Sequence, residues 1–217
     1  MKILFCKVAW MKDYQGITED DKPFNGGDYV KTTGKAHEEY NFKSVDFDEN
    51  ELMINCDDKK YGFYLAGKYY LGFFEPKSTN KEKVNQIRIE NINGCELCKS
   101  EPYINDVLVI WCATAIQGGI RVVGWYNHAT VYRYLQESQL SKLTGREYFR
   151  NNIKCFNAIA ETKNCVLLPH TNRNPWIVPL AKKRNYGFGQ SMVWYATETS
   201  AKQYIEELVE GINNYKP

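Results

Sequence analysis

Long apolar runs and a secretion signal are both missing from this sequence. The longest apolar stretches, such as residues 107–110, are far shorter than the ~20 residues that a helix needs to cross a bilayer. The apolar start is interrupted by Lys7 and Lys12, and no small-residue cleavage site follows, so we expect a buried strand there. The seven cysteines are odd in number, and several lie in strand-like runs, as expected for reduced thiols. These features predict a cytoplasmic protein that makes no membrane contact.

An excess of charge of one sign is also missing. The 28 Lys and Arg residues nearly balance the 26 Asp and Glu residues, which leaves a net charge of +2. Such a surface does not attract polyanions as a whole, so binding to nucleic acid would need a local basic patch. The sequence leaves the oligomeric state open.

Complete catalytic and cofactor-binding motifs are not found. There is no P-loop, no GxGxxG after a strand and no GxSxG. Cys95 and Cys98 form a CxxC, but no second ligand pair follows at the spacing of a zinc site. His37 precedes two glutamates that could orient its imidazole, but the sequence places no nucleophile beside it. We therefore predict no catalytic residue, no metal and no cofactor, and favour a binding protein over an enzyme.

One loose motif keeps an enzymatic alternative open. Asp58, Glu75 and Lys77 fit an Asp…Glu-x-Lys pattern, in which carboxylates hold Mg²⁺ and the lysine steadies an activated water. Pro76 stands where that pattern requires a regular strand, and proline cannot donate to a strand ladder. A Mg²⁺-dependent nuclease is therefore the first alternative function.

The apolar pattern predicts one strand-rich α+β domain over residues 1–217, which are 43% hydrophobic. Residues 106–115 are almost continuously apolar, which is typical of a central strand buried on both faces. Residues 121–125 and 129–134 are expected to pair with it in a meander, with a turn at 126–128.

Three further segments complete the expected fold. Residues 60–74 read as two strands around a turn at 66–68. Residues 11–40 are polar and rich in glycine, and so long a stretch indicates a loop that either has a function or folds locally. After Ser200, a plausible helix N-cap, an apolar stripe predicts a C-terminal helix docked on the core, formed by Tyr204, Leu208, Ile212 and Tyr215.

Tryptophan, amide and basic side chains occur together in the expected loops. Asn127 follows Trp125, and Gln190 precedes Trp194. Aromatic faces stack on nucleobases and amides read base edges, while the basic residues 182–184 could hold phosphates. The competing interpretation is that the tryptophans are core residues, because tryptophan is highly buried on average.

Five segments carry a resemblance to a poorly characterised group of bacterial proteins, for which no activity can be carried over. They are residues 26–30 (Gly-Gly-Asp-Tyr-Val), 37–42 (His-Glu-Glu-Tyr-Asn-Phe), 122–133 (Val-Val-Gly-Trp-Tyr-Asn-His-Ala-Thr-Val-Tyr-Arg), 165–169 (Cys-Val-Leu-Leu-Pro) and 189–196 (Gly-Gln-Ser-Met-Val-Trp-Tyr-Ala). In addition, residues 120–133 resemble a hairpin of PUA-like domains of the EVE and YTH branches. That resemblance implies a mixed β-barrel or strongly curved sheet with flanking helices, and recognition of a modified base flipped into an aromatic cage.

Together these features predict a non-enzymatic reader of a modified base, with DNA favoured over RNA and modification-dependent restriction or defence as the implied setting. The base would be held by Trp10, Asn41, Trp125, Tyr126, Asn127, Gln190 and Trp194. Phosphates would be held by Arg173, Lys182, Lys183 and Arg184. A protein-interaction scaffold without a small ligand is the second alternative.

Overall fold

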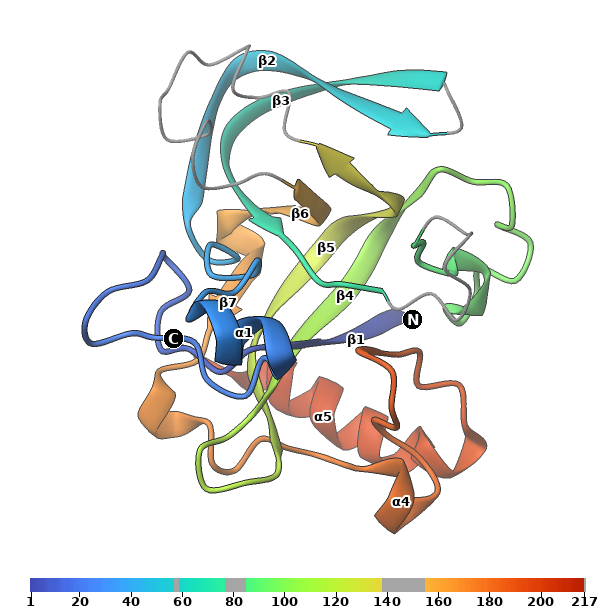
Figure 1. Ribbon diagram of the computed structural model, residues 1–217. Helices are drawn as coiled ribbons and strands as arrows, with labels where there is room; N and C mark the ends of the chain where they lie inside the picture. The colour runs from blue at the N-terminus through green and yellow to red at the C-terminus, as the bar shows by residue number, and fades with distance from the viewer. Residues whose placement is uncertain (57–58, 77–84, 138–154, 217) are drawn as a thin grey trace.

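A computed structural model describes residues 1–56, 59–76, 85–137 and 155–216 (Figure 1). Within these residues nine strands form one sheet in the order β2-β3-β6-β5-β4-β1-β9, with β7 and β8 paired to β5. The strands are β1 Lys2–Val8, β2 Ser44–Cys56, β3 Lys59–Gly72, β4 Tyr103–Thr114, β5 Ile120–Glu137, β6 Cys155–Glu161, β7 Cys165–Leu167, β8 Ile177–Val178 and β9 Val193–Trp194. The helices are α1 Gly27–Thr33, α4 Ala181–Arg184 and α5 Lys202–Asn214.

The sheet is mixed, because β1 and β4 pair in parallel, whereas all the other strand pairs of the sheet are antiparallel. This arrangement confirms the strand-rich α+β class and the C-terminal helix. The barrel that was one expected form is not made by the described strands, since the sheet stays open with β2 and β9 at its ends. Figure 1 shows β2 and β3 bending strongly as they leave the centre of the sheet.

Buried side chains on the two faces of the central strands form the two largest of the hydrophobic cores in the described residues. Along β1, Leu4 and Cys6 point to one core, whereas Ile3 and Phe5 point to the other, because successive side chains of a strand alternate. The strand β4 alternates in the same way, which confirms the strand predicted at 106–115. We call the core that contains Leu4 the loop-side core, since residues 10–14 cover it, and the core that contains Phe5 the helix-side core.

The helix α5 covers the helix-side core, as its apolar stripe predicted. Leu208 and Ile212 are buried there, and Tyr204 and Tyr215 pack beside them. The predicted N-cap was wrong: Ser200 lies in a 3₁₀ turn at 199–201, and the helix begins at Lys202 with no side-chain cap. No helix in the described part of the chain has the length and hydrophobicity that a bilayer crossing requires.

Two predicted turns are instead bulges within long strands. The strand β5 runs through 126–128, where His128 has a φ of 52° and the register against β4 shifts. The strand β3 likewise runs through Gly67, whose φ is 95°, opposite a register shift in β2. A bulge absorbs an extra residue and bends the strand without reversing it, so glycine and polar residues marked the right places but the wrong structure.

Candidate ligand-binding pocket

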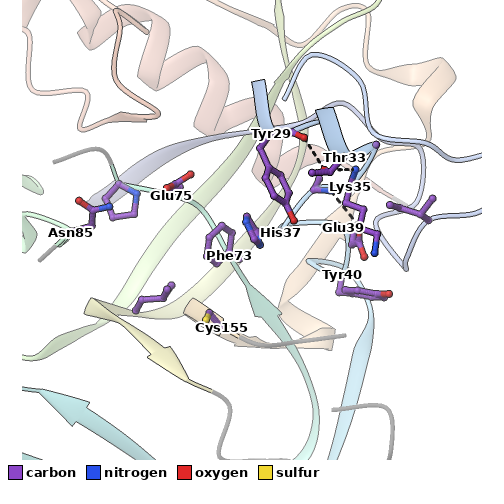
Figure 2. A pocket seen from close by; sticks show the side chains of 15 residues that line it. Tyr29, Thr33, Lys35, His37, Glu39, Tyr40, Phe73, Glu75, Asn85 and Cys155 are labelled. Carbon is purple, nitrogen blue, oxygen red and sulfur yellow. Dashed lines mark hydrogen bonds between the residues drawn. The ribbon is translucent and has the colours of Figure 1, made fainter. Parts of the chain in front are cut away.

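A cavity of about 670 Å³ opens beside α1, where the loop at 34–40 meets the ends of β3, β5 and β6 (Figure 2). Most of its wall comes from the loop at 11–40 that the sequence marked as functional or locally folded. The lining residues are Ile17, Tyr29, Thr33, Gly34, Lys35, Ala36, His37, Glu39, Tyr40, Phe73, Glu75, Pro76, Asn85, Leu135 and Cys155.

Three aromatic rings follow one another along this wall. The rings of Tyr29 and His37 are stacked, with centroids 4.4 Å apart and planes at 16°. The ring of Phe73 lies next, 5.4 Å from His37 and tilted by 51°. Figure 2 shows the three rings next to one another. Tyr29 and His37 are exposed, whereas Phe73 is buried. Because Tyr29 and His37 stack on each other and Phe73 is buried, the exposed ring of Tyr29 offers a π-face to a planar ligand.

The local fold brings Tyr29 and His37 together. The helix α1 ends at Gly34, which has a φ of 67° and donates its N–H to the carbonyl of Val30. A left-handed residue at this position ends a helix and reverses the chain. Val30 and Ala36 then pack against Ala9 at the end of β1, so the returning chain lies against the helix that it has just left.

The side chains of two buried asparagines bind the backbone of Phe73 and Phe74, which directly follow β3. The Asn41 amide accepts the Phe73 N–H at 2.9 Å and donates to the Phe73 carbonyl at 3.0 Å. Asn157 does the same for Phe74, at 3.2 and 2.6 Å. The Tyr126 hydroxyl in turn donates to the backbone carbonyl of Asn41. Asn41 and Tyr126, which were predicted to contact a base, therefore position the wall of the pocket instead.

Replacing Asn41 with alanine is expected to lower the free energy of unfolding by about 2–4 kcal/mol, because a buried N–H and a buried carbonyl of Phe73 lose their partner. Urea denaturation measures the change. The matched control is Asn127→Ala, which truncates a half-buried asparagine of β5 and is expected to cost less than about 0.5 kcal/mol. Equal effects of the two changes would contradict this account.

Carboxylates dominate the charge of the pocket. Glu39 and Glu75 line it, together with Lys35. Behind His37, Glu38 accepts the Ala9 N–H at 2.6 Å; desolvation raises the pKa of Glu38, and the neighbouring Glu75 charge adds to that increase. Tyr40 is held by a hydrogen bond to Glu39, and desolvation together with that carboxylate raises the pKa of Tyr40.

The tryptophans predicted to form one cage lie in two separate cores. Trp10 and Tyr126 are buried in the loop-side core, whereas Trp125 and Trp194 are buried in the helix-side core. Trp125 and Tyr126 are consecutive strand residues and therefore point to opposite faces of the sheet. The Trp194 indole packs on Phe5, with ring centroids 4.5 Å apart. The expected shared cleft is not formed, and the competing core interpretation describes these rings.

The remaining predicted site residues are scattered. Asn127 is half-buried in β5 and Gln190 is exposed before β9, and neither lines the pocket. Arg173, which was predicted to hold a phosphate, is fully buried and donates to backbone carbonyls. Residues 182–184 are exposed on α4, which lies well away from α1 in Figure 1.

The nuclease and CxxC motifs gain no support from their placement. Asp58 and Lys77 fall outside the described residues, and Glu75 lines the pocket. Within the four described segments, no three His, Cys, Asp or Glu side chains come together as metal ligands would. Desolvation raises the pKa of Cys95, with Cys98 adding to the increase, which opposes the thiolate that a redox CxxC requires.

Comparison with known proteins found no match to any family model, curated protein or solved structure. The sequence nevertheless indicated some of the pocket residues. Tyr29 and His37 lie in two of the segments that carried the resemblance, within the loop predicted to have a function or to fold locally. No sequence signal connected them to Phe73, which directly follows β3, more than thirty residues further on.

Proposed function

We propose that the chain is a non-enzymatic binding protein that takes a nucleobase into this pocket and so reads nucleic acid. The observation that carries the proposal is the row of Tyr29, His37 and Phe73 along an open cavity of about 670 Å³. Nucleobases are recognised by stacking on aromatic faces, with polar groups at their edges. Ligand pockets of ~300–1,000 Å³ are typical for molecules of this size.

Polar groups stand at both ends of the aromatic row. Figure 2 places Glu75 and Asn85 beyond Phe73, and Lys35 and Glu39 on the opposite side of Tyr29. Carboxylate, amide and ammonium groups in these positions can accept from or donate to the edge of a stacked base. A base in the pocket would thus meet aromatic faces along its plane and hydrogen-bonding groups at its rim.

The finer elements of the proposal come from the sequence. We propose a relationship to PUA-like readers and a modified base in DNA as the ligand. We also propose modification-dependent restriction or defence as the setting and a cytoplasmic location. The scaffold alternative does not account for a cavity with an aromatic wall. The nuclease alternative depends on residues 58 and 77, which lie outside the described part of the chain.

Replacing Tyr29 with alanine is expected to weaken nucleobase binding by about tenfold or more, because stacking of one base on one aromatic ring contributes ~1–3 kcal/mol. Fluorescence anisotropy of short labelled single strands, with competition by free nucleosides, measures the affinity. The matched control is Phe24→Ala, since Phe24 is an aromatic residue of the same loop with a similar exposure, 44% against 43% for Tyr29, and does not line the pocket.

Two results would refute the proposal. One is the lack of binding of any modified or unmodified oligonucleotide or nucleoside by the wild-type chain. The other is equal affinity of the Tyr29→Ala and Phe24→Ala variants, which would place the binding site elsewhere.

A further inference from the structure

We infer that the pocket selects a base that carries a positive charge, of the kind produced by methylation of a ring nitrogen, as in 1-methyladenine or 3-methylcytosine. This inference rests on the proposed function and names the class of base that the same site takes. It depends on two features of the wall, its rings and its carboxylates, which both favour a cation over a neutral base.

The aromatic row favours a delocalised cation. Tyr29 stacks on His37 with one face and is 43% exposed, so it offers an open ring face to the cavity. Phe73 lies buried next to His37, and the Lys43 ammonium already lies 5.4 Å from the centroid of the Tyr40 ring at the Glu39 end. The face of an aromatic ring carries negative electrostatic potential, which attracts a cation placed over it. A methylated cationic base is planar, so it can stack on such rings and gain this attraction at the same time.

The carboxylates act in the same direction. Glu39 and Glu75 line the two ends of the row. Lys35 is the only lysine among the described lining residues, and it lies at the Glu39 end. The end formed by Phe73 and Glu75 therefore combines an aromatic ring with a carboxylate that no lysine of the described lining offsets.

The same imbalance disfavours anions inside the cavity. A phosphate placed at the Glu75 end would meet like charge that no lysine of the described lining offsets, which costs free energy at any effective dielectric constant. The base alone would enter, while the phosphates of its strand stay outside. A positive charge on the base is favoured, because it is attracted to the negatively charged carboxylates of the pocket.

Isomeric nucleosides isolate the effect of charge. 1-Methyladenosine and N6-methyladenosine have the same non-hydrogen atoms, but only the first binds an extra proton and is a cation at neutral pH, and 3-methylcytidine and 5-methylcytidine form a second such pair. Isothermal titration of the wild-type chain with each of the four is expected to give about tenfold tighter binding of the cationic isomers, the size of one cation–π contact with a nearby carboxylate.

A substitution at Glu75 tests whether this carboxylate causes the preference for cationic nucleosides. Glu75→Gln is expected to reduce the preference for the cationic isomer to about threefold or less, and to leave the affinity for the neutral isomer within about twofold of wild type. Glu210→Gln, on the exposed face of α5, is the matched control and is expected to keep the full preference.

The titrations distinguish failure of the charge preference from failure of nucleobase binding itself. Binding of the neutral isomers as tightly as the cationic ones would overturn the inference and leave a nucleobase pocket in place. Failure of all four nucleosides and of their unmodified parents to bind would overturn the proposed function as well. A preference for the cation that survives Glu75→Gln unchanged would refute the role assigned to this end of the row.

Discussion

Replacing Arg173 with alanine is expected to lower the free energy of unfolding by about 3–5 kcal/mol, although the sequence assigned this side chain to phosphate binding. The guanidinium is fully buried and donates to the carbonyls of Leu168, at 2.9 Å, and of Met11 and Lys12. It also lies 5.2 Å from the ring of Trp10, so the substitution removes packing as well as three hydrogen bonds.

The chain segment that Arg173 holds is also held from its other side. Asp21 accepts the Lys12 N–H at 2.6 Å and the Asp13 N–H at 2.8 Å, so the carbonyls of this turn bind Arg173 while its amides bind Asp21. Because this turn begins the loop at 11–40, which forms most of the pocket wall, we expect Arg173→Ala to loosen the pocket as well as the core.

Urea denaturation of Arg173→Ala beside Arg184→Ala tests this account. Arg184 is exposed on α4, and its loss is expected to change the free energy of unfolding by less than about 0.5 kcal/mol. If Arg173→Ala kept wild-type stability and lost only nucleic-acid binding, the phosphate-binding role predicted from the sequence would be restored and the structural role would be wrong.

Adding a single methyl group at Gly124 is expected to destabilise the chain by about 3 kcal/mol or more. A Cβ at this position would lie 2.3 Å from the carbonyl oxygen of Val166 and 2.7 Å from the ring of Phe42. The backbone of β7 pairs with β5 at this point, with Gly124 opposite Leu167, so the clash is relieved only if β7 moves away from the sheet.

The matched control for Gly124→Ala is Gly189→Ala. At Gly189 a Cβ meets no atom within 4 Å and the backbone is not in the left-handed region, so we expect no loss of stability, or a gain of up to about 1 kcal/mol from the stiffer unfolded chain. Thermal unfolding followed by circular dichroism compares the two. Equal melting temperatures for both variants would show that β7 does not pack on β5 as described.

The failure of the predicted tryptophan cage has a simple physical cause. Trp125 and Tyr126 are neighbours in a strand, and side chains of neighbouring strand residues point to opposite faces. The alternation was present in the sequence, but the expected turn at 126–128 hid it, since residues in a turn need not alternate. Once β5 is recognised as a continuous strand, the two rings can only serve different cores.

The pocket could be only half predicted for a related reason. Tyr29 and His37 are close in sequence, so a helix that ends at Gly34 and a chain that turns back suffice to stack them. Phe73 joins them through hydrogen bonds between its backbone and the side chain of Asn41, more than thirty residues away. Such a pairing leaves no periodic trace in the sequence, because a single buried amide follows no spacing rule.

The amino-acid sequence by itself determined the elements that depend on local patterns: the strand-rich α+β class, the doubly buried strand at 106–115 and the docked C-terminal helix. Only the tertiary structure decided which aromatic rings share a wall, which arginine is buried, and where carboxylates gather. Periodicity specifies the face to which a side chain points, whereas a pocket depends on which distant segments meet, and that choice is made by the packing of the whole chain.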